Sequence, residues 1–178
     1  SVRDALPLVK FRAQCMQDAV PEGTGAMAAI LGLEDDAARA ACAEAAQAEV
    51  VQAVNFNAPG QVVIAGHKAA VARAIEACKA RGAKRAMPLP VSAPFHSSLM
   101  QPAALRLGSY LEKVSFSSPA VPVLNNVDVK VENDPSKIKD ALVRQAASPV
   151  RWAEIIRAMA EQGVTHVVEC GPGKVLAG

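Results

Sequence analysis

Hydrophobic positions along this chain recur with two periods, and the change from one to the other separates predicted strands from predicted helices. The alternation is clearest between residues 23 and 91. Strands are predicted over 25–33, 50–56, 61–66 and 84–92, and alanine-rich helices over 34–47 and 68–82. The first helix carries acids in its first turn and the second ends at a glycine, as helix termini prefer. The order βαββαβ predicts a ferredoxin-like unit.

The residues on either side of this unit alternate helices and strands at a wider spacing. Helices are predicted over 97–114 and 4–20, and two more, each begun by a proline, over 135–147 and 149–163. Extended runs around a polar turn are predicted over 120–131, and a buried strand over 165–170. We therefore expect an α/β fold with an inserted domain. The layered core would comprise 1–22 and 92–178, and the inserted domain 23–91.

A charged residue interrupts the apolar face of the first predicted helix. At about 100° per residue, Arg12 falls in the middle of a stripe that includes Leu8, Phe11, Cys15 and Met16. In one interpretation its stem packs while its head reaches solvent or pairs with an acid. In the other, its planar fork faces inward and holds a ligand carboxylate by two parallel hydrogen bonds. Few acids are placed to partner it locally, which leaves room for a ligand.

His96 lies in the stretch VSAPFHSSLM, on a predicted loop that follows a strand. Proteins of the α/β class often carry their chemistry on such loops. A catalytic base needs a nucleophile and an orienting acceptor. Ser97 and Ser98 are too close in sequence to face it, and Ser98 is predicted to cap the next helix. No G-x-S-x-G elbow occurs in the chain, so a nucleophile for His96 is missing from these residues.

Three amide side chains lie where one predicted strand turns into the next. Asn55 and Asn57 alternate on one face of their strand, and Gln61 follows the turn. Turn formation before Pro59 explains Asn57 alone. The alternative is that all three amides line a polar groove.

The segment GPGK at 171–174 follows the last predicted strand and invites comparison with a phosphate-binding loop. It lacks the G-x-x-x-x-G-K-[ST] spacing, so a strand-to-helix turn is favoured. Cys170 beside it continues the apolar run VVEC, and we expect it in the core rather than as a nucleophile.

Composition excludes several classes of function. With 51% apolar and 20% charged residues the chain can bury a core. A net charge of +2 does not favour a nucleic-acid partner. The four cysteines lack metal-site spacing, which predicts no metal and free thiols in a reducing cytoplasm. No run approaches the roughly 18 apolar residues of a membrane span, and no signal peptide is visible.

Five stretches, in this order, resemble the bacterial malonyl-CoA:acyl carrier protein transacylases of fatty acid synthesis. They are LVKFRAQCMQDAVPEGTGAMAAILGL, VNFNAPGQVVIAGH, KRAMPLPVSAPFHSSLM, PVLNNVDV and VECGPGKVL. The resemblance covers essentially the whole chain. It implies an α/β-hydrolase-like core with an inserted ferredoxin-like subdomain. It also implies a ping-pong transfer of malonyl from coenzyme A to the phosphopantetheine thiol of acyl carrier protein, without a cofactor.

The resemblance also assigns roles to three residues. His96 matches the general base of both half-reactions, and Arg12 matches the arginine that clamps the malonyl carboxylate. Gln145 matches the residue whose main-chain carbonyl orients the histidine, where many triads use an acid. The family's nucleophilic serine lies in a G-H-S-L-G elbow that is not among these residues. We therefore expect this chain to be a C-terminal portion that is inactive alone.

Further residues match the family's substrate cleft. Asn55, Asn57 and Gln61 fall where the family holds coenzyme A or the pantetheine arm. In the basic cluster that begins at Lys79, Lys84 and Arg85 are either a solvated helix end or a docking site for the acidic carrier protein.

Two rival functions remain open on the residues alone. One is a non-catalytic ferredoxin-like module that binds a small molecule; an RNA-binding version lacks the stacking aromatics it would need. The other is an acyltransferase that prefers a different acyl-CoA.

Overall fold

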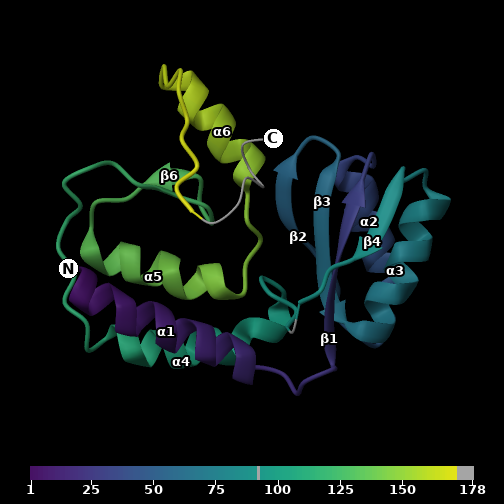
Figure 1. Cartoon of the computed structure of the whole chain (residues 1–178), viewed down its shortest axis with the longest axis horizontal. Coiled ribbons are helices and arrows are strands. Elements are labelled where there is room, and N and C mark those ends of the chain that lie inside the picture. The colour runs from purple at the N-terminus through teal and green to yellow at the C-terminus, as the bar shows by residue number, and fades with distance from the viewer. Residues whose placement is uncertain (92, 172–178) are drawn as a thin grey trace.

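The computed structural model describes residues 1–91 and 93–171, which form two lobes (Figure 1). The smaller lobe contains a four-stranded antiparallel sheet in the order β2-β3-β1-β4. Its strands are β1 (Gly25–Leu31), β2 (Val51–Ala58), β3 (Gln61–His67) and β4 (Arg85–Pro88). Its helices are α2 (Asp35–Ala46) and α3 (Lys68–Ala80). This order and connectivity are ferredoxin-like, as the alternating periods predicted.

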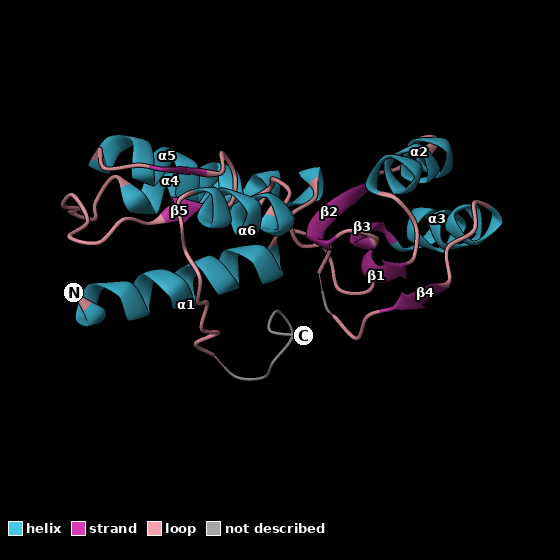
Figure 2. Ribbon diagram, turned by 90° about the horizontal axis from the view of Figure 1, so that it is seen from above, coloured by secondary structure: helices cyan, strands magenta, loops and turns pink. Residues whose placement is uncertain are grey.

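Both helices of the smaller lobe cover one face of its sheet (Figure 2). The core between them joins β-branched strand residues such as Ile30 and Ile64 to small helix residues such as Ala41 and Ala74. Small helix side chains let the helices approach the sheet closely. Within the sheet, Gly66 of β3 lies close to the start of β2, because a Cβ at this position would meet the carbonyl oxygen of Val50.

Two irregularities in β2 decide which way its side chains point. The pairing of β2 with β3 shifts between Ala53 and Asn55 and again between Phe56 and Ala58. Ala53 and Phe56 belong to the core under the helices, whereas Val54 packs in a separate cluster with Met27. The bulge thus interrupts the alternation, as an extra residue in one strand does. It turns Asn55 and Asn57 toward the sheet face that the helices leave uncovered.

The larger lobe consists mainly of helices. Its elements are α1 (Val2–Asp18), the short 3-10 helix η1 (Ser98–Met100), α4 (Gln101–Leu111), the hairpin strands β5 (Leu124–Asn125) and β6 (Lys130–Val131), α5 (Pro135–Ala146) and α6 (Trp152–Glu161). Helix α4 packs against both α1 and α5, and Phe11 of α1 stacks on Tyr110 of α4 with ring centroids 4.4 Å apart.

Two sequence predictions for residues 165–170 are wrong. The strand expected over 165–170 does not form, and Val167 and Val168 are exposed. A strand needs a neighbour to accept its backbone hydrogen bonds, and no described strand lies beside it. Cys170, expected in the core, is exposed for the same reason. Residues 172–174 of GPGK lie outside the described residues.

The helix expected from Pro149 begins instead at Trp152. Val150 forms a parallel bridge with Asn55: its N–H donates to the carbonyl of Val54 at 2.8 Å, and its own carbonyl accepts from Phe56 at 2.9 Å. Extended backbone at residue 150 therefore ties the larger lobe to the edge of the smaller lobe's sheet.

Candidate active site

A cavity of about 560 Å³ opens between α1, the uncovered face of the small sheet and the segment that follows β4. Arg12 of α1 and His96 of the segment after β4 both line it, and Asn55 and Asn57 lie on its sheet wall. Apolar side chains complete the lining, among them Met16, Met27, Val63, Leu89 and Phe95. The structure thus brings together four of the residues that the sequence singled out.

Gln61 is not part of this lining. It begins β3, pairs with Ala58 and Leu31, and is exposed. The sequence placed it beside the asparagines because only the turn separates them. In the structure Gln61 does lie at that turn, paired with Ala58, but its exposed side chain does not line the cavity.

His96 occupies an unusual backbone conformation, with φ of 62°. Few residues other than glycine adopt this left-handed region, and those that do are often at functional sites. The loop around it is fixed by its neighbours: buried Ser97 donates its hydroxyl to the carbonyl of Pro94 at 2.7 Å. The backbone N–H of Ser98 donates to the side-chain oxygen of Gln52 at 2.7 Å. Ser98 is therefore not the helix cap that we expected, since Ser97 occupies the N-cap position of η1 and Gln52 satisfies the free N–H.

The imidazole of His96 is oriented by Gln145. Its Nδ1 lies 3.1 Å from the main-chain carbonyl oxygen of Gln145. A carbonyl only accepts, so Nδ1 carries the proton and Nε2 keeps its lone pair. This tautomer is the one that a general base requires.

Burial lowers the pKa of His96 below its ordinary value of 6.5, partly offset by its hydrogen bond to Gln145, and the positive charge of Arg12 lowers it further. The imidazole is consequently neutral at pH 7. It is available as a proton acceptor over a wider acidic range than an exposed histidine.

Arg12 has no carboxylate partner among the described residues. Its Nη2 donates to the side-chain Oε1 of Gln145 at 3.1 Å. Burial lowers the pKa of its guanidinium, which nevertheless remains charged in proteins. The interpretation in which Arg12 pairs with a core acid is therefore wrong. Arg12 is thus a half-buried cation beside a cavity, without an acid partner among residues 1–91 and 93–171, and it has the charge that an anionic ligand would need.

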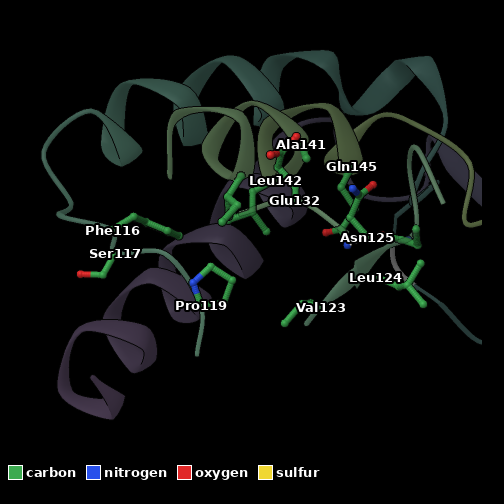
Figure 3. A pocket seen from close by; sticks show the side chains of 12 residues that line it. Phe116, Ser117, Pro119, Val123, Leu124, Asn125, Glu132, Ala141, Leu142 and Gln145 are labelled. Atoms are coloured by element: carbon green, nitrogen blue, oxygen red, sulfur yellow. Dashed lines mark hydrogen bonds between the residues drawn. The ribbon is translucent and has the colours of Figure 1, made fainter. Parts of the chain in front are cut away.

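Gln145 consequently contacts both key residues, one through its backbone and one through its side chain. The sequence had indicated only the carbonyl contact. Gln145 also borders a second, apolar pocket of about 340 Å³ between α5 and residues 116–126, whose walls include Phe116, Leu124 and Leu142 (Figure 3).

Lys84 and Arg85 lie outside the cavity lining, at the start of β4, and both are exposed. Two other members of the basic cluster are paired, Lys79 with Glu76 and Arg81 with Glu44. No described acid pairs with Lys84 or Arg85.

Residues 1–91 and 93–171 contain neither a cluster of metal-ligating side chains nor a membrane-spanning helix. No group of three or more potential metal-ligating side chains occurs there, and no helix is both long and apolar enough to span a bilayer.

The sequence matches the acyl transferase domain model over residues 1–177. The chain belongs to the acyl transferase domain family. Among relatives in this family, the malonyl CoA-acyl carrier protein transacylase of Escherichia coli K12 is 61% identical over 98% of this chain and 57% of its own length. The chain thus spans a little more than half the length of the curated relatives it matches.

Solved structures of the acyl transferase family superpose closely on the chain. The acyl-carrier-protein S-malonyltransferase of Burkholderia pseudomallei matches with a TM-score of 0.95 and 66% identity, covering 98% of this chain and 57% of that one. A malonyl-transacylase solved in complex with a type II polyketide acyl-carrier protein matches with a TM-score of 0.96 and 55% identity, over 97% and 56% of the two chains. The predicted fold class, part of an α/β-hydrolase-like core with an inserted ferredoxin-like subdomain, is confirmed.

Proposed function

We propose that this chain is the portion of a malonyl-CoA:acyl carrier protein transacylase that holds the catalytic base and the carboxylate clamp. The observation that carries the proposal is that Arg12 and His96 line one cavity and share Gln145 as a partner. A base and a cation in one cavity fit a substrate that carries both a thioester and a carboxylate. The names of the relatives agree with this substrate.

In the first half-reaction, Nε2 of His96 accepts the proton of a serine hydroxyl as the serine oxygen attacks the thioester carbonyl of malonyl-CoA. The tetrahedral intermediate collapses, the C–S bond breaks, and the imidazolium returns its proton to the departing coenzyme A thiolate. The carbonyl of Gln145 keeps the imidazole in its tautomer throughout. We propose that this serine is that of the family's G-H-S-L-G elbow, which is not among residues 1–178.

In the second half-reaction, His96 accepts the proton of the phosphopantetheine thiol. The thiolate attacks the malonyl ester, the C–O bond breaks, and the imidazolium returns the proton to the serine oxygen. No cofactor is needed, because both transfers exchange one nucleophile for another at the same carbonyl carbon.

Arg12 supplies selectivity for malonyl over uncharged acyl groups. Its guanidinium forms two parallel hydrogen bonds to the free carboxylate, which positions the thioester carbonyl for attack. Because no described acid neutralises Arg12, the carboxylate has no internal competitor.

Asn55 and Asn57 are proposed to hydrogen-bond the amides of the pantetheine arm, because they lie along one wall of the cavity. The sequence prediction for Gln61 remains untested by this geometry. All four cysteines are unpaired, which supports a reducing compartment, and we propose the cytoplasm.

The acidic carrier protein is proposed to dock on Lys84 and Arg85, the two unpaired cations of the basic cluster. A related malonyl-transacylase has been solved in complex with an acyl-carrier protein, which supports the choice of this partner. The term full-length protein is used for this chain together with the remaining length that its relatives have. In the full-length protein, the double substitution Lys84→Glu/Arg85→Glu should raise the KM for carrier protein, because it replaces attraction to an acidic partner by repulsion. The control is Lys113→Glu, an exposed lysine just beyond α4. Equal KM values in both variants would refute the docking site.

The proposed reaction is tested by transfer of malonyl from malonyl-CoA to phosphopantetheinylated carrier protein. The full-length protein should catalyse it, and His96→Ala should abolish it. If the protein binds but never transfers an acyl group, it is a binding module. If it transfers acetyl as well as malonyl, the carboxylate clamp is wrong.

A further inference from the structure

The side chain of Gln145 connects Arg12 to the β5–β6 hairpin. Its Oε1 accepts from Nη2 of Arg12 at 3.1 Å, and its Nε2 donates to Oδ1 of Asn126 at 2.7 Å. All three side chains are partly buried. The backbone carbonyl of Asn126 accepts from the N–H of Arg151 at 3.3 Å.

A glutamine amide has two different ends, so its orientation matters. The oxygen only accepts and the nitrogen only donates. Arg12 offers only donors, so its partner must be the oxygen of Gln145. The side-chain oxygen of Asn126 favours the same orientation from the other end. If the amide of Gln145 were reversed, its NH2 group would face the guanidinium of Arg12, donor against donor, and its oxygen would face the oxygen of Asn126, acceptor against acceptor.

The turn that carries Asn126 is held by contacts of the residues on either side of it. The side-chain oxygen of Asn125 accepts from the backbone N–H groups of Val127 and Asp128, which fixes the turn of the hairpin. Both carboxylate oxygens of Asp128 accept from Arg144 at 2.8 Å. Arg144 directly precedes Gln145 in α5. The ion pair between Asp128 and Arg144 therefore attaches the hairpin to α5 one residue before Gln145, whose side-chain amide Asn126 contacts.

We propose that Asn126 is a positioning residue for the carboxylate-binding Arg12 and that it acts through the side chain of Gln145. The inference rests on the proposed function, because it assigns Asn126 to the selectivity of that same site. It makes a specific distinction: His96 is held by the backbone carbonyl of Gln145 and Arg12 by the side chain. Loss of Asn126 should therefore disturb the clamp and leave the base in place.

The test compares Asn126→Leu with Asn133→Leu in the full-length protein. Asn133 is an exposed asparagine just before α5, which makes its substitution a control for the same chemical change nearby. Asn126→Leu should raise the KM for malonyl-CoA about tenfold, the net contribution of roughly one hydrogen bond. Its kcat, its rate with acetyl-CoA and the acid inflection of its pH profile should stay within about twofold of wild type, and Asn133→Leu should match wild type throughout.

Asn126→Asp tests whether the acceptor is what matters. It keeps an oxygen opposite Nε2 of Gln145, so its KM should rise less than that of Asn126→Leu. This variant also answers the case in which Asn126→Leu fails to fold. Rescue by the aspartate supports a positioning role, and an aspartate variant as impaired as the leucine overturns it.

Two other outcomes also overturn the inference. One is an Asn126→Leu protein with an unchanged KM while wild type transfers malonyl; the proposed function then stands and the role of Asn126 falls. The other is equal loss with malonyl-CoA and acetyl-CoA, which indicates general structural damage. If wild type transfers no malonyl at all, the proposed function fails first and this inference falls with it.

Discussion

Replacing Arg12 by methionine is the sharpest perturbation of the proposed carboxylate clamp. Methionine retains an unbranched apolar stem in a similar volume and removes the charge. In the structure, the guanidinium has one amide partner, Gln145, and no described acid. Removing the guanidinium therefore does not strand the charge of any described carboxylate. The free energy of unfolding should change by less than about 1 kcal/mol.

The magnitude of the effect on catalysis follows from the contacts that are lost. A hydrogen bond to a charged group contributes about 1.5–3 kcal/mol. The two bonds of one fork share the desolvation of the same charge, and Arg12 is only half-buried, so we expect a total of about 2–3 kcal/mol rather than double the single value. At 1.36 kcal/mol per tenfold change, kcat/KM for malonyl-CoA should fall roughly 30- to 160-fold.

The assay is release of coenzyme A by the full-length protein in the presence of carrier protein, measured with malonyl-CoA and with acetyl-CoA. Acetyl has no carboxylate, so its kcat/KM should change by less than about threefold, and selectivity should collapse. Thermal unfolding of both proteins provides the control for folding. Equal loss with both substrates at unchanged stability would refute the reasoning, because it would mean that Arg12 does not read the carboxylate.

Further consequences concern His96, Gly66 and the buried thiols. A general base must be neutral, and the pKa of His96 is lowered, so kcat/KM should fall only as the pH drops through an inflection below 6.5. Arg12→Met removes a positive charge near the imidazole and should move this inflection to higher pH. An inflection that stays fixed or moves to lower pH would contradict the charge effect assigned to Arg12. Gly66→Ala should destabilise the protein by about 1–3 kcal/mol, since its Cβ would meet backbone atoms of residues 50 and 51. The control is Gly108→Ala in α4, where a Cβ would make only ordinary contact with Val143; this variant should be neutral or more stable by up to about 1 kcal/mol. Similar chemical-denaturation curves for the two variants would count against the close approach of Gly66 to residues 50 and 51. Cys42, whose pKa burial raises to about 12, should resist alkylation by iodoacetamide at pH 8 until the protein is unfolded; mass spectrometry of native protein that shows rapid labelling at Cys42 would disprove its burial.

The smaller lobe could be predicted from the sequence because its information is local. Each helix and strand buries one face within a few tens of residues, so the hydrophobic period reports the element directly. The orientation of Asn55 and Asn57 could not be obtained in this way. Simple alternation places them on the same face as Val51 and Ala53, which lies under the helices. The bulge near Val54 reverses that assignment, and it depends on pairing with β3.

The larger lobe was harder to predict because its contacts are between residues distant in sequence. The apolar run at 165–170 has the composition of a strand, but strand formation depends on a neighbour, and no described strand supplies one. Likewise, Arg12 and Gln145 stand 133 positions apart, and periodicity within α1 shows only that Arg12 faces inward. The hydrogen-bonded amides of Gln145 and Asn126 left one weak signal in the sequence, a pair of asparagines in a polar turn within the matched stretch PVLNNVDV.

The most direct test of the whole account is mass spectrometry of the full-length protein after brief incubation with malonyl-CoA in the absence of carrier protein. The account predicts one malonyl group per protein, attached by an ester to a serine outside residues 1–178 and discharged when phosphopantetheinylated carrier protein is added. The His96→Ala protein should remain unlabelled. Absence of an adduct on wild type, or an adduct on Ser97, Ser98 or a cysteine of this chain, would contradict the account.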